Sequence, residues 1–170
     1  WNDEYDLNDK RIGVIGTGSS SVQMLSPLAH TGKQVNLFQR TAQWVMHTEN
    51  IEYSPFDKFL KRKIPLLGYL TRRFYDLIGE LFGQAALKDG WQRRYIDKAT
   101  LENLNTVKDP ELRKKLTPDH KAMCKRMIVS DTYYPAIQRD NVDVITDNIL
   151  RIEPKGVVVD DGSDSGRLVE

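Results

Sequence analysis

The sequence has little of three features that identify common classes of protein. It holds one cysteine, Cys124, among 170 residues, which excludes internal disulfides and favours a reducing, cytoplasmic location. It has no uninterrupted apolar run near the roughly 18 residues that span a membrane. Its histidines, His30, His47 and His120, lack the paired spacing of metal ligands. We therefore expect no membrane span and no metal site.

An excess of charge of one sign is also missing. Lys plus Arg number 25 and Asp plus Glu number 24, giving a formal net charge of +1. Such a balance does not predict binding to nucleic acid or to another polyanion. The length suits one domain with a hydrophobic core and a small helical annex.

The most informative stretch is RIGVIGTGSSSVQMLSPLAHTGKQVNLFQRT, residues 11 to 41. It begins with a short apolar run, residues 12 to 15, typical of a parallel strand that is covered on both faces. In the turn that follows, Gly16 permits a tight bend and Gly18 lets a pyrophosphate approach the backbone. Ser21 stands where glycine or alanine is usual, and it is still small enough for close packing between helix and strand.

Helical periodicity follows the turn, from residue 19 to about 30. Val22, Leu25 and Ala29 form its apolar stripe, and Pro27 should bend or end the helix. The N-terminus of such a helix offers unpaired N–H groups and a positive dipole end to an anion. Residues 35 to 38 then form the second strand.

The residues after the second strand predict the choice of cofactor. NAD-dependent proteins usually carry Asp or Glu here, whereas this chain has Gln39, Arg40 and Thr41. An amide, a guanidinium and a hydroxyl suit the 2′-phosphate of NADP. The alternative interpretation is a glycine turn that only packs a helix, with Arg40 as a solvated surface charge.

Helices dominate the middle of the chain. After irregular chain at residues 43 to 52, apolar residues recur with helical spacing from 54 to 81, and Pro65 and Gly68 should divide this run into two helices. Its polar face is basic and could lie on an anionic membrane surface, although a solvated helix face is commoner. A short helix is predicted at residues 100 to 107, and another begins after Asp109, its N-cap.

Strands return near the end of the sequence, at residues 127 to 129, 142 to 145, 149 to 152 and 156 to 160, with a hairpin turn at 161 to 166. The predicted fold is α/β: a Rossmann-like three-layer dinucleotide-binding domain with a helical insertion and a C-terminal β-meander or hairpin. Residues 1–52 and 122–170 form the NADP-binding domain, and residues 53–121 form the insertion. The connector at residues 1 to 9 and the short return strand at 167 to 170 suggest a piece of a larger protein.

Three segments, GVIGTGSSSVQ, FQRTAQW and CKRMIVSDTYYPAIQRDNV, resemble the NADPH-binding region of class B flavoprotein monooxygenases of the Baeyer-Villiger type. The resemblance covers nearly the whole chain, and Trp1 matches the last residue of a family fingerprint. It implies an enzyme in which NADPH reduces bound FAD and the flavin then uses O₂ to oxygenate ketones, sulfides or amines.

The resemblance also implies roles for particular residues. Arg126 matches the catalytic arginine beside flavin and nicotinamide, which stabilises the negative charge of the flavin peroxide. Lys125 matches a lysine that reaches the 2′-phosphate, together with Arg40 and Thr41. The remaining cofactor-binding residues follow the first strand and are Gly16, Thr17, Gly18, Ser19, Ser20, Ser21 and Gln23.

The family places FAD on a second glycine-rich unit, which we do not find in this sequence. We therefore expect FAD to bind mainly outside this chain, and the chain alone to bind NADP(H) at best and not to turn over a ketone or heteroatom substrate. Its exposed apolar surface should make it self-associate. The competing interpretation is a non-catalytic dinucleotide-binding regulatory module. We expect Cys124 to be a small buried residue, and Tyr133 and Tyr134 to serve packing.

Overall fold

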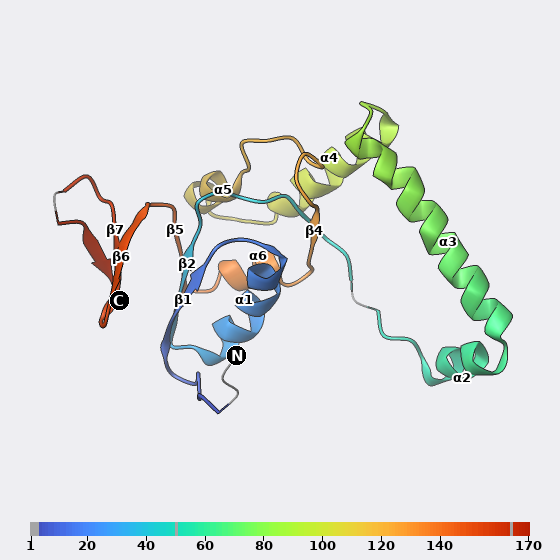
Figure 1. Ribbon diagram of the computed structural model, residues 1–170, viewed down its shortest axis with the longest axis horizontal. Helices are drawn as coiled ribbons and strands as arrows, with labels where there is room; N and C mark the ends of the chain where they lie inside the picture. Colours follow the sequence, from blue (N-terminus) through green and yellow to red (C-terminus); the bar gives the residue numbers. More distant parts are fainter. Residues whose placement is uncertain (1–3, 50, 164) are drawn as a thin grey trace.

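The computed structural model describes residues 4–49, 51–163 and 165–170, and Trp1 lies outside them. Within them, a three-stranded parallel sheet in the order β1-β2-β5 occupies the centre (Figure 1). Its strands are β1 (Arg11–Ile15), β2 (Gln34–Phe38) and β5 (Val142–Ile145). The middle strand, β2, pairs with both neighbours, so Leu37 lies opposite Val14 on one side and Val144 on the other.

Helices α1 (Ser19–Thr31) and α6 (Tyr133–Ile137) pack against each other beside this sheet. The predicted stripe is confirmed, because Val22, Leu25 and Ala29 are buried. Pro27 does not end α1, which continues to Thr31. Burial of Ala29 beyond the proline compensates for the one backbone hydrogen bond that proline cannot donate.

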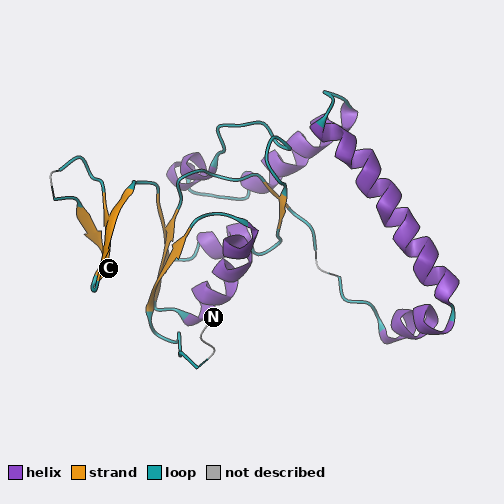
Figure 2. Ribbon diagram, viewed as in Figure 1, coloured by secondary structure: helices purple, strands orange, loops and turns teal. Residues whose placement is uncertain are grey.

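The opposite side of the parallel sheet carries a second, antiparallel sheet in the order β6-β7-β8. Its strands are β6 (Ile149–Glu153), β7 (Gly156–Val159) and β8 (Arg167–Val169). Phe38 and Ile145 of the parallel sheet form a buried cluster with Val159 of β7. Helices, parallel sheet and antiparallel sheet thus make three layers (Figure 2), which confirms the predicted fold with its C-terminal meander.

One expectation about β1 is wrong. The run of apolar residues predicts a strand covered on both faces, but β1 lies at the edge of its sheet. Val14 is buried, whereas Ile15 is 56% exposed. The buried contacts of the antiparallel sheet are with Phe38 and Ile145, in β2 and β5, and Ile15 of β1 lies outside this cluster.

The chain leaves the parallel sheet after β2 and returns to it through α6. The elements in between are β3 (Val45–Met46), α2 (Pro55–Lys63), α3 (Pro65–Gly83), the 3-10 helix η1 (Gln84–Ala86), α4 (Trp91–Leu104), α5 (Pro110–Leu116) and β4 (Ile128–Val129). Strands β3 and β4 pair in parallel and close the base of the insertion. Residues 43 to 52, expected to be irregular, thus contain a short strand.

The helix boundaries of the insertion follow the sequence in part. Pro65 separates α2 from α3 as predicted, but Gly68 lies inside α3 because glycine keeps its N–H and costs a helix only about 1 kcal/mol. Helix α4 begins at Trp91, earlier than predicted. Asp109 caps α5 as expected, since its carboxylate accepts a hydrogen bond of 3.0 Å from the N–H of Glu111.

Helices α2 and α3 extend away from the three layers (Figure 1). Neither contains a buried residue. Large apolar side chains of α3 are exposed, including Tyr69, Phe74 and Leu77 at 60%, 59% and 66%. In the described parts of the chain, every helix is too short or too polar to cross a bilayer.

Candidate functional site

A pocket of about 630 Å³ lies at the carboxyl ends of the parallel strands. Open α/β sheets bind their ligands at this edge. The lining comes from the turn after β1, the segment after β2, the segment after β5 and one residue of the loop before β4. In residue numbers these are 15–18, 38–41, 43, 147–149 and 125.

Gly16 makes the sharp bend after β1. Its φ of +100° lies in the region that favours glycine, as the sequence predicts. Its N–H donates a hydrogen bond of 2.9 Å to the carbonyl of Phe38, which ties the turn to the end of β2. Thr17 is buried, and its hydroxyl donates a bond of 2.7 Å to the carbonyl of Thr41. Two walls of the pocket are therefore fixed to each other.

Gly18 is the N-cap of α1 and has an ordinary φ of −73°. Its backbone does not require glycine, yet a Cβ added there would meet no atom within 4 Å. The helix start carries no side-chain cap and no acidic residue in its first turn. The first N–H groups of α1 therefore face open space beside a positive dipole end, which favours an anion.

The three residues after β2 differ in their surroundings. Gln39 is 4% exposed, and its amide donates a hydrogen bond of 2.7 Å to the carbonyl of Lys115 in α5. This amide serves to pack α5 on the sheet. Arg40 is exposed and Thr41 half-buried, and both line the pocket. The guanidinium of Arg40 makes no hydrogen bond or ion pair to any other residue that the structure describes.

Lys125 brings a second positive charge to the pocket from a distant part of the chain. In the described structure its ammonium group, like the guanidinium of Arg40, makes no hydrogen bond or ion pair. Asp147 also lines the pocket, but its carboxylate forms an ion pair of 3.1 Å with Arg167. Asp119 has a lowered pKa, chiefly because of its hydrogen bond with His120, and the charge of Lys125 adds to this effect. Two cations thus remain available to an anionic ligand.

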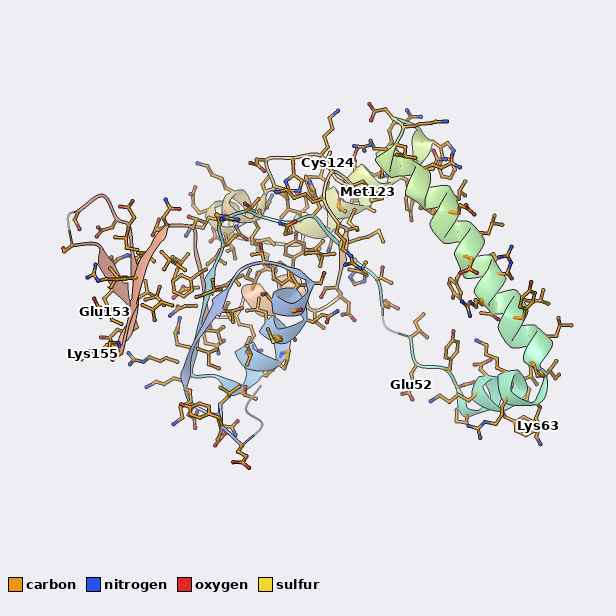
Figure 3. The ribbon with its side chains drawn as sticks, viewed as in Figure 1. Glu52, Lys63, Met123, Cys124, Glu153 and Lys155 are labelled. Carbon is orange, nitrogen blue, oxygen red and sulfur yellow. The ribbon has the colours of Figure 1, made fainter. Side chains whose placement is uncertain are left out.

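Arg126 follows Lys125 but does not line this pocket. It borders a small adjoining hollow with Gln43, Trp44 and Met127. Cys124, expected to be buried, is exposed. Figure 3 shows Cys124 and Met123 in the loop beside α4. Cys124 is exposed because it shares a surface loop with Lys125 and Arg126. The residue type alone does not determine whether a cysteine is buried.

The structure brings together six of the predicted site residues and leaves five outside the pocket lining. The six are Gly16, Thr17, Gly18, Arg40, Thr41 and Lys125. The other five are Ser19, Ser20, Ser21, Gln23 and Arg126. Sequence reasoning missed residues 147–149, which also line the pocket. The signal was available, because these residues follow a parallel strand whose carboxyl end lies at the same sheet edge.

Tyr133 and Tyr134 lie outside the site. Both are buried, with ring centroids 5.3 Å apart, and burial raises the pKa of each phenol above its ordinary range. The hydroxyl of Tyr134 is buried without a hydrogen-bond partner among the described residues. Their environment is that of the core, and we assign them to packing.

One family model matches nearly the whole chain. Residues 2–168 match the model of a family described as flavin-binding monooxygenase-like. An uncharacterized monooxygenase of Mycobacterium tuberculosis is 42% identical over 162 residues, covering 95% of this chain and 33% of that protein. A Baeyer-Villiger monooxygenase of Streptomyces coelicolor is 35% identical over 166 residues, covering 97% of this chain and 32% of that protein. The chain thus spans about a third of the length of these relatives.

Solved structures share the fold. A steroid monooxygenase bound to NADP matches with a TM-score of 0.75 at 22% identity, over 98% of this chain and 39% of that one. Cyclohexanone monooxygenase in its closed crystal structure also matches with a TM-score of 0.75, at 20% identity, over 100% of this chain and 38% of that one. With the fold, the pocket and the family model in agreement over nearly all its residues, the chain belongs to the flavin-binding monooxygenase-like family.

Proposed function

We propose that this chain is the NADP(H)-binding segment of an FAD-dependent monooxygenase. The whole enzyme would insert one oxygen atom of O₂ into ketones, or oxygenate sulfur or nitrogen atoms. The observation that carries the proposal is the open space at Gly18, at the start of α1 and in one pocket with Arg40 and Lys125. Relatives of about 33% to 35% identity that are named Baeyer-Villiger monooxygenases support the reaction class.

The pocket fits a dinucleotide that carries an extra phosphate. The pyrophosphate would lie where a Cβ at Gly18 would project, and the N–H groups of Ser19, Ser20 and Ser21 would donate to it. The hydroxyl of Thr17 already donates to Thr41, so Thr17 would contribute through its backbone. Gln23 lies further along α1, and we assign it a supporting contact.

The 2′-phosphate would bind between Arg40 and Lys125, whose charges enter the pocket from different segments. The planar guanidinium of Arg40 can donate two hydrogen bonds to one phosphate, and Lys125 adds a compact charge. Thr41 supplies a hydroxyl beside Arg40. A hydrogen bond to a charged group contributes about 1.5 to 3 kcal/mol, so two of them favour NADP over NAD by roughly 10² to 10⁴.

NADP(H) would supply the hydride that reduces a flavin. Arg126 is exposed in this chain. In the whole enzyme it would hold a permanent positive charge beside the reacting groups, where burial would neutralise a lysine more easily. The sequence contains one glycine-rich strand-turn-helix unit, and the dinucleotide pocket uses it. We therefore assign FAD mainly to residues outside this chain and expect no turnover from the chain alone.

The proposed domains are residues 1–52 and 122–170 for the cofactor and residues 53–121 for the insertion. Pairing of β2 with β5 supports the union of the first and last parts. Pairing of β3 with β4 supports an insertion that departs from and returns to one place. We place the protein in the cytoplasm because its one cysteine is exposed and suits a reducing compartment.

The test is calorimetric titration of the chain with NADP⁺ and with NAD⁺. Arg40→Ala and Lys125→Ala should each weaken NADP⁺ binding by about ten- to a hundredfold and leave NAD⁺ binding nearly unchanged. Arg139→Ala is the matched control. Arg139 is exposed and lies between α6 and the start of β5, whereas the pocket lies at the other end of β5.

Equal affinities for NADP⁺ and NAD⁺ would refute the assignment of Arg40 and Lys125. They would favour a regulatory module that responds to either nucleotide. An effect of Arg139→Ala as large as that of Arg40→Ala would show that the losses reflect net charge and not a phosphate site.

A further inference from the structure

The loop between α5 and β4 carries both Lys125 and Arg126, yet most of it lies outside helices and strands. A side chain that selects a phosphate must be held in place, or the entropy of ordering it reduces the gain in affinity. Within this loop Met123 has a φ of +65°, which is uncommon for a residue with a side chain. One hydrogen bond within the loop supports this bend, from the N–H of Cys124 to the carbonyl of Lys121 over 3.2 Å, and further hydrogen bonds come from outside the loop.

Two side chains from other segments donate hydrogen bonds to this loop. Trp44, shortly after β2, donates from Nε1 to the carbonyl of His120 over 2.6 Å. Arg93, in α4, donates from Nη1 to the carbonyl of Ala122 over 3.2 Å. The two acceptors lie on either side of Lys121, just before the residue with positive φ. Pairing of Ile128 with Val45 then fixes the far end of the loop.

Arg93 is an unusual residue for this position, because its charged side chain is only 10% exposed. Nε donates to the carbonyl of Ala85 over 2.8 Å and Nη2 to that of Ala86 over 3.4 Å, while Nη1 reaches the loop. Asp89, on the surface, lies 3.3 Å from Nε. One guanidinium thus joins η1, α4 and the loop, with each of its three nitrogens used.

Lysine cannot reproduce these contacts, since it offers one nitrogen where arginine offers a rigid fork of three. The same place is packed by an apolar cluster of Ala85, Ile96 and Ala122. An apolar side chain at position 93 could extend that cluster without burying a charge. Unlike an apolar side chain, the guanidinium donates a hydrogen bond that orients the Ala122 carbonyl and hence the path of the chain toward Lys125.

We infer that Arg93 and Trp44 are positioning residues that hold the loop so that Lys125 enters the dinucleotide pocket. Through Arg93, the helical insertion of residues 53–121 then contributes to cofactor selection although it supplies no residue to the pocket lining that the structure describes. This inference rests on the proposed function, in which Lys125 binds the 2′-phosphate.

The test measures the ratio of NADP⁺ to NAD⁺ affinity by calorimetry in the full chain. Arg93→Lys keeps the charge and the stem but loses the fork, and Trp44→Phe keeps an aromatic ring but loses the donor. Each should lower the ratio by about tenfold with little change in NAD⁺ affinity. In the double variant Arg93→Lys/Lys125→Ala, the ratio should equal that of Lys125→Ala alone, because both changes remove the same contact.

Arg94→Lys is the control, since Arg94 is exposed and its guanidinium makes no hydrogen bond or ion pair within the described residues. Circular dichroism at the titration temperature confirms that each variant is folded. Equal losses for NADP⁺ and NAD⁺ would limit Arg93 and Trp44 to a general structural role and overturn the inference. If the unsubstituted chain prefers NADP⁺ and the variants keep the same ratio of affinities, the inference is also overturned, but the proposed function stands. No preference in the unsubstituted chain would overturn both.

Discussion

Gly16 and Gly18 lie two positions apart in one turn, yet alanine should affect them in opposite ways. Gly16 has a φ of +100°, so alanine there is strained by about 1 to 3 kcal/mol. Gly18 has a φ of −73° and open space where its Cβ would lie. Replacing glycine by alanine at an N-cap costs about 0.5 to 1 kcal/mol, and the stiffer unfolded chain offsets this by about 0.4 to 1 kcal/mol. The fold should therefore tolerate Gly18→Ala.

Cofactor binding should show the reverse. The methyl group of Gly18→Ala would occupy the space that we assign to the pyrophosphate. Steric overlap of one methyl group in a packed site costs about 1 to 3 kcal/mol, which is roughly a 5- to 150-fold loss of NADP⁺ affinity. Because the pyrophosphate is common to both cofactors, NAD⁺ should lose affinity by the same factor. This separates Gly18 from Arg40 and Lys125, whose changes act on the ratio.

Two measurements test these predictions: thermal unfolding, followed by circular dichroism, reports stability, and calorimetric titration reports cofactor affinity. Each kcal/mol lost shifts the Tm of a chain of this size by about 2 to 4 °C, so Gly16→Ala should unfold measurably earlier. Gly18→Ala should keep its Tm and lose affinity. If Gly18→Ala binds NADP⁺ as tightly as the unsubstituted chain, no phosphate approaches this backbone and the assignment of the site is refuted.

Two further predictions concern the core and the surface. Burial raises the pKa of Tyr133 and Tyr134 above 10.0, so only the unfolded chain loses these protons near pH 10, and the stability they contribute is complete below that pH and falls above it. Tyr134→Phe should raise the free energy of unfolding by about 1 kcal/mol, because the hydroxyl has no partner among the described residues. In urea titrations above pH 10, the free energy of unfolding should fall less steeply with pH in this variant, and an equal fall in both proteins would contradict the prediction. The exposed apolar side chains of α3 predict self-association in light scattering, which Phe74→Lys with Leu77→Lys should abolish, and a monodisperse monomer of 19.6 kDa before substitution would contradict it.

The parts of the fold that depend on local sequence were predictable. The bend at Gly16, the buried stripe of α1 and the cap of α5 each arise within a few residues of the chain. Arg40 reaches the pocket because it is the second residue after β2, a strand whose carboxyl end forms the pocket edge. For these features, the residue types and their spacing contain the physical cause.

Features that depend on distant partners were not predictable in the same way. Ile15 is exposed because the antiparallel sheet packs on β2 and β5. The pattern of apolar residues in β1 does not indicate which strands that sheet covers. Strands β3 and β4 have two residues each and exist because they pair with each other. The exposure of Cys124 follows from the path of a loop that Arg93 and Trp44 fix from other segments.

The central pairing of β2 with β5 has a consequence for synthesis of the chain. Gln34 and Asp143, whose side chains are hydrogen-bonded across this pair, are separated by 109 residues. At ribosomal rates of about 5 to 20 residues per second, β2 waits roughly 5 to 20 seconds for its partner. During that time Val35 and Leu37, fully buried in the finished sheet, have no β5 to cover them. During this interval the nascent chain exposes apolar side chains and an unpaired strand edge, both of which favour aggregation.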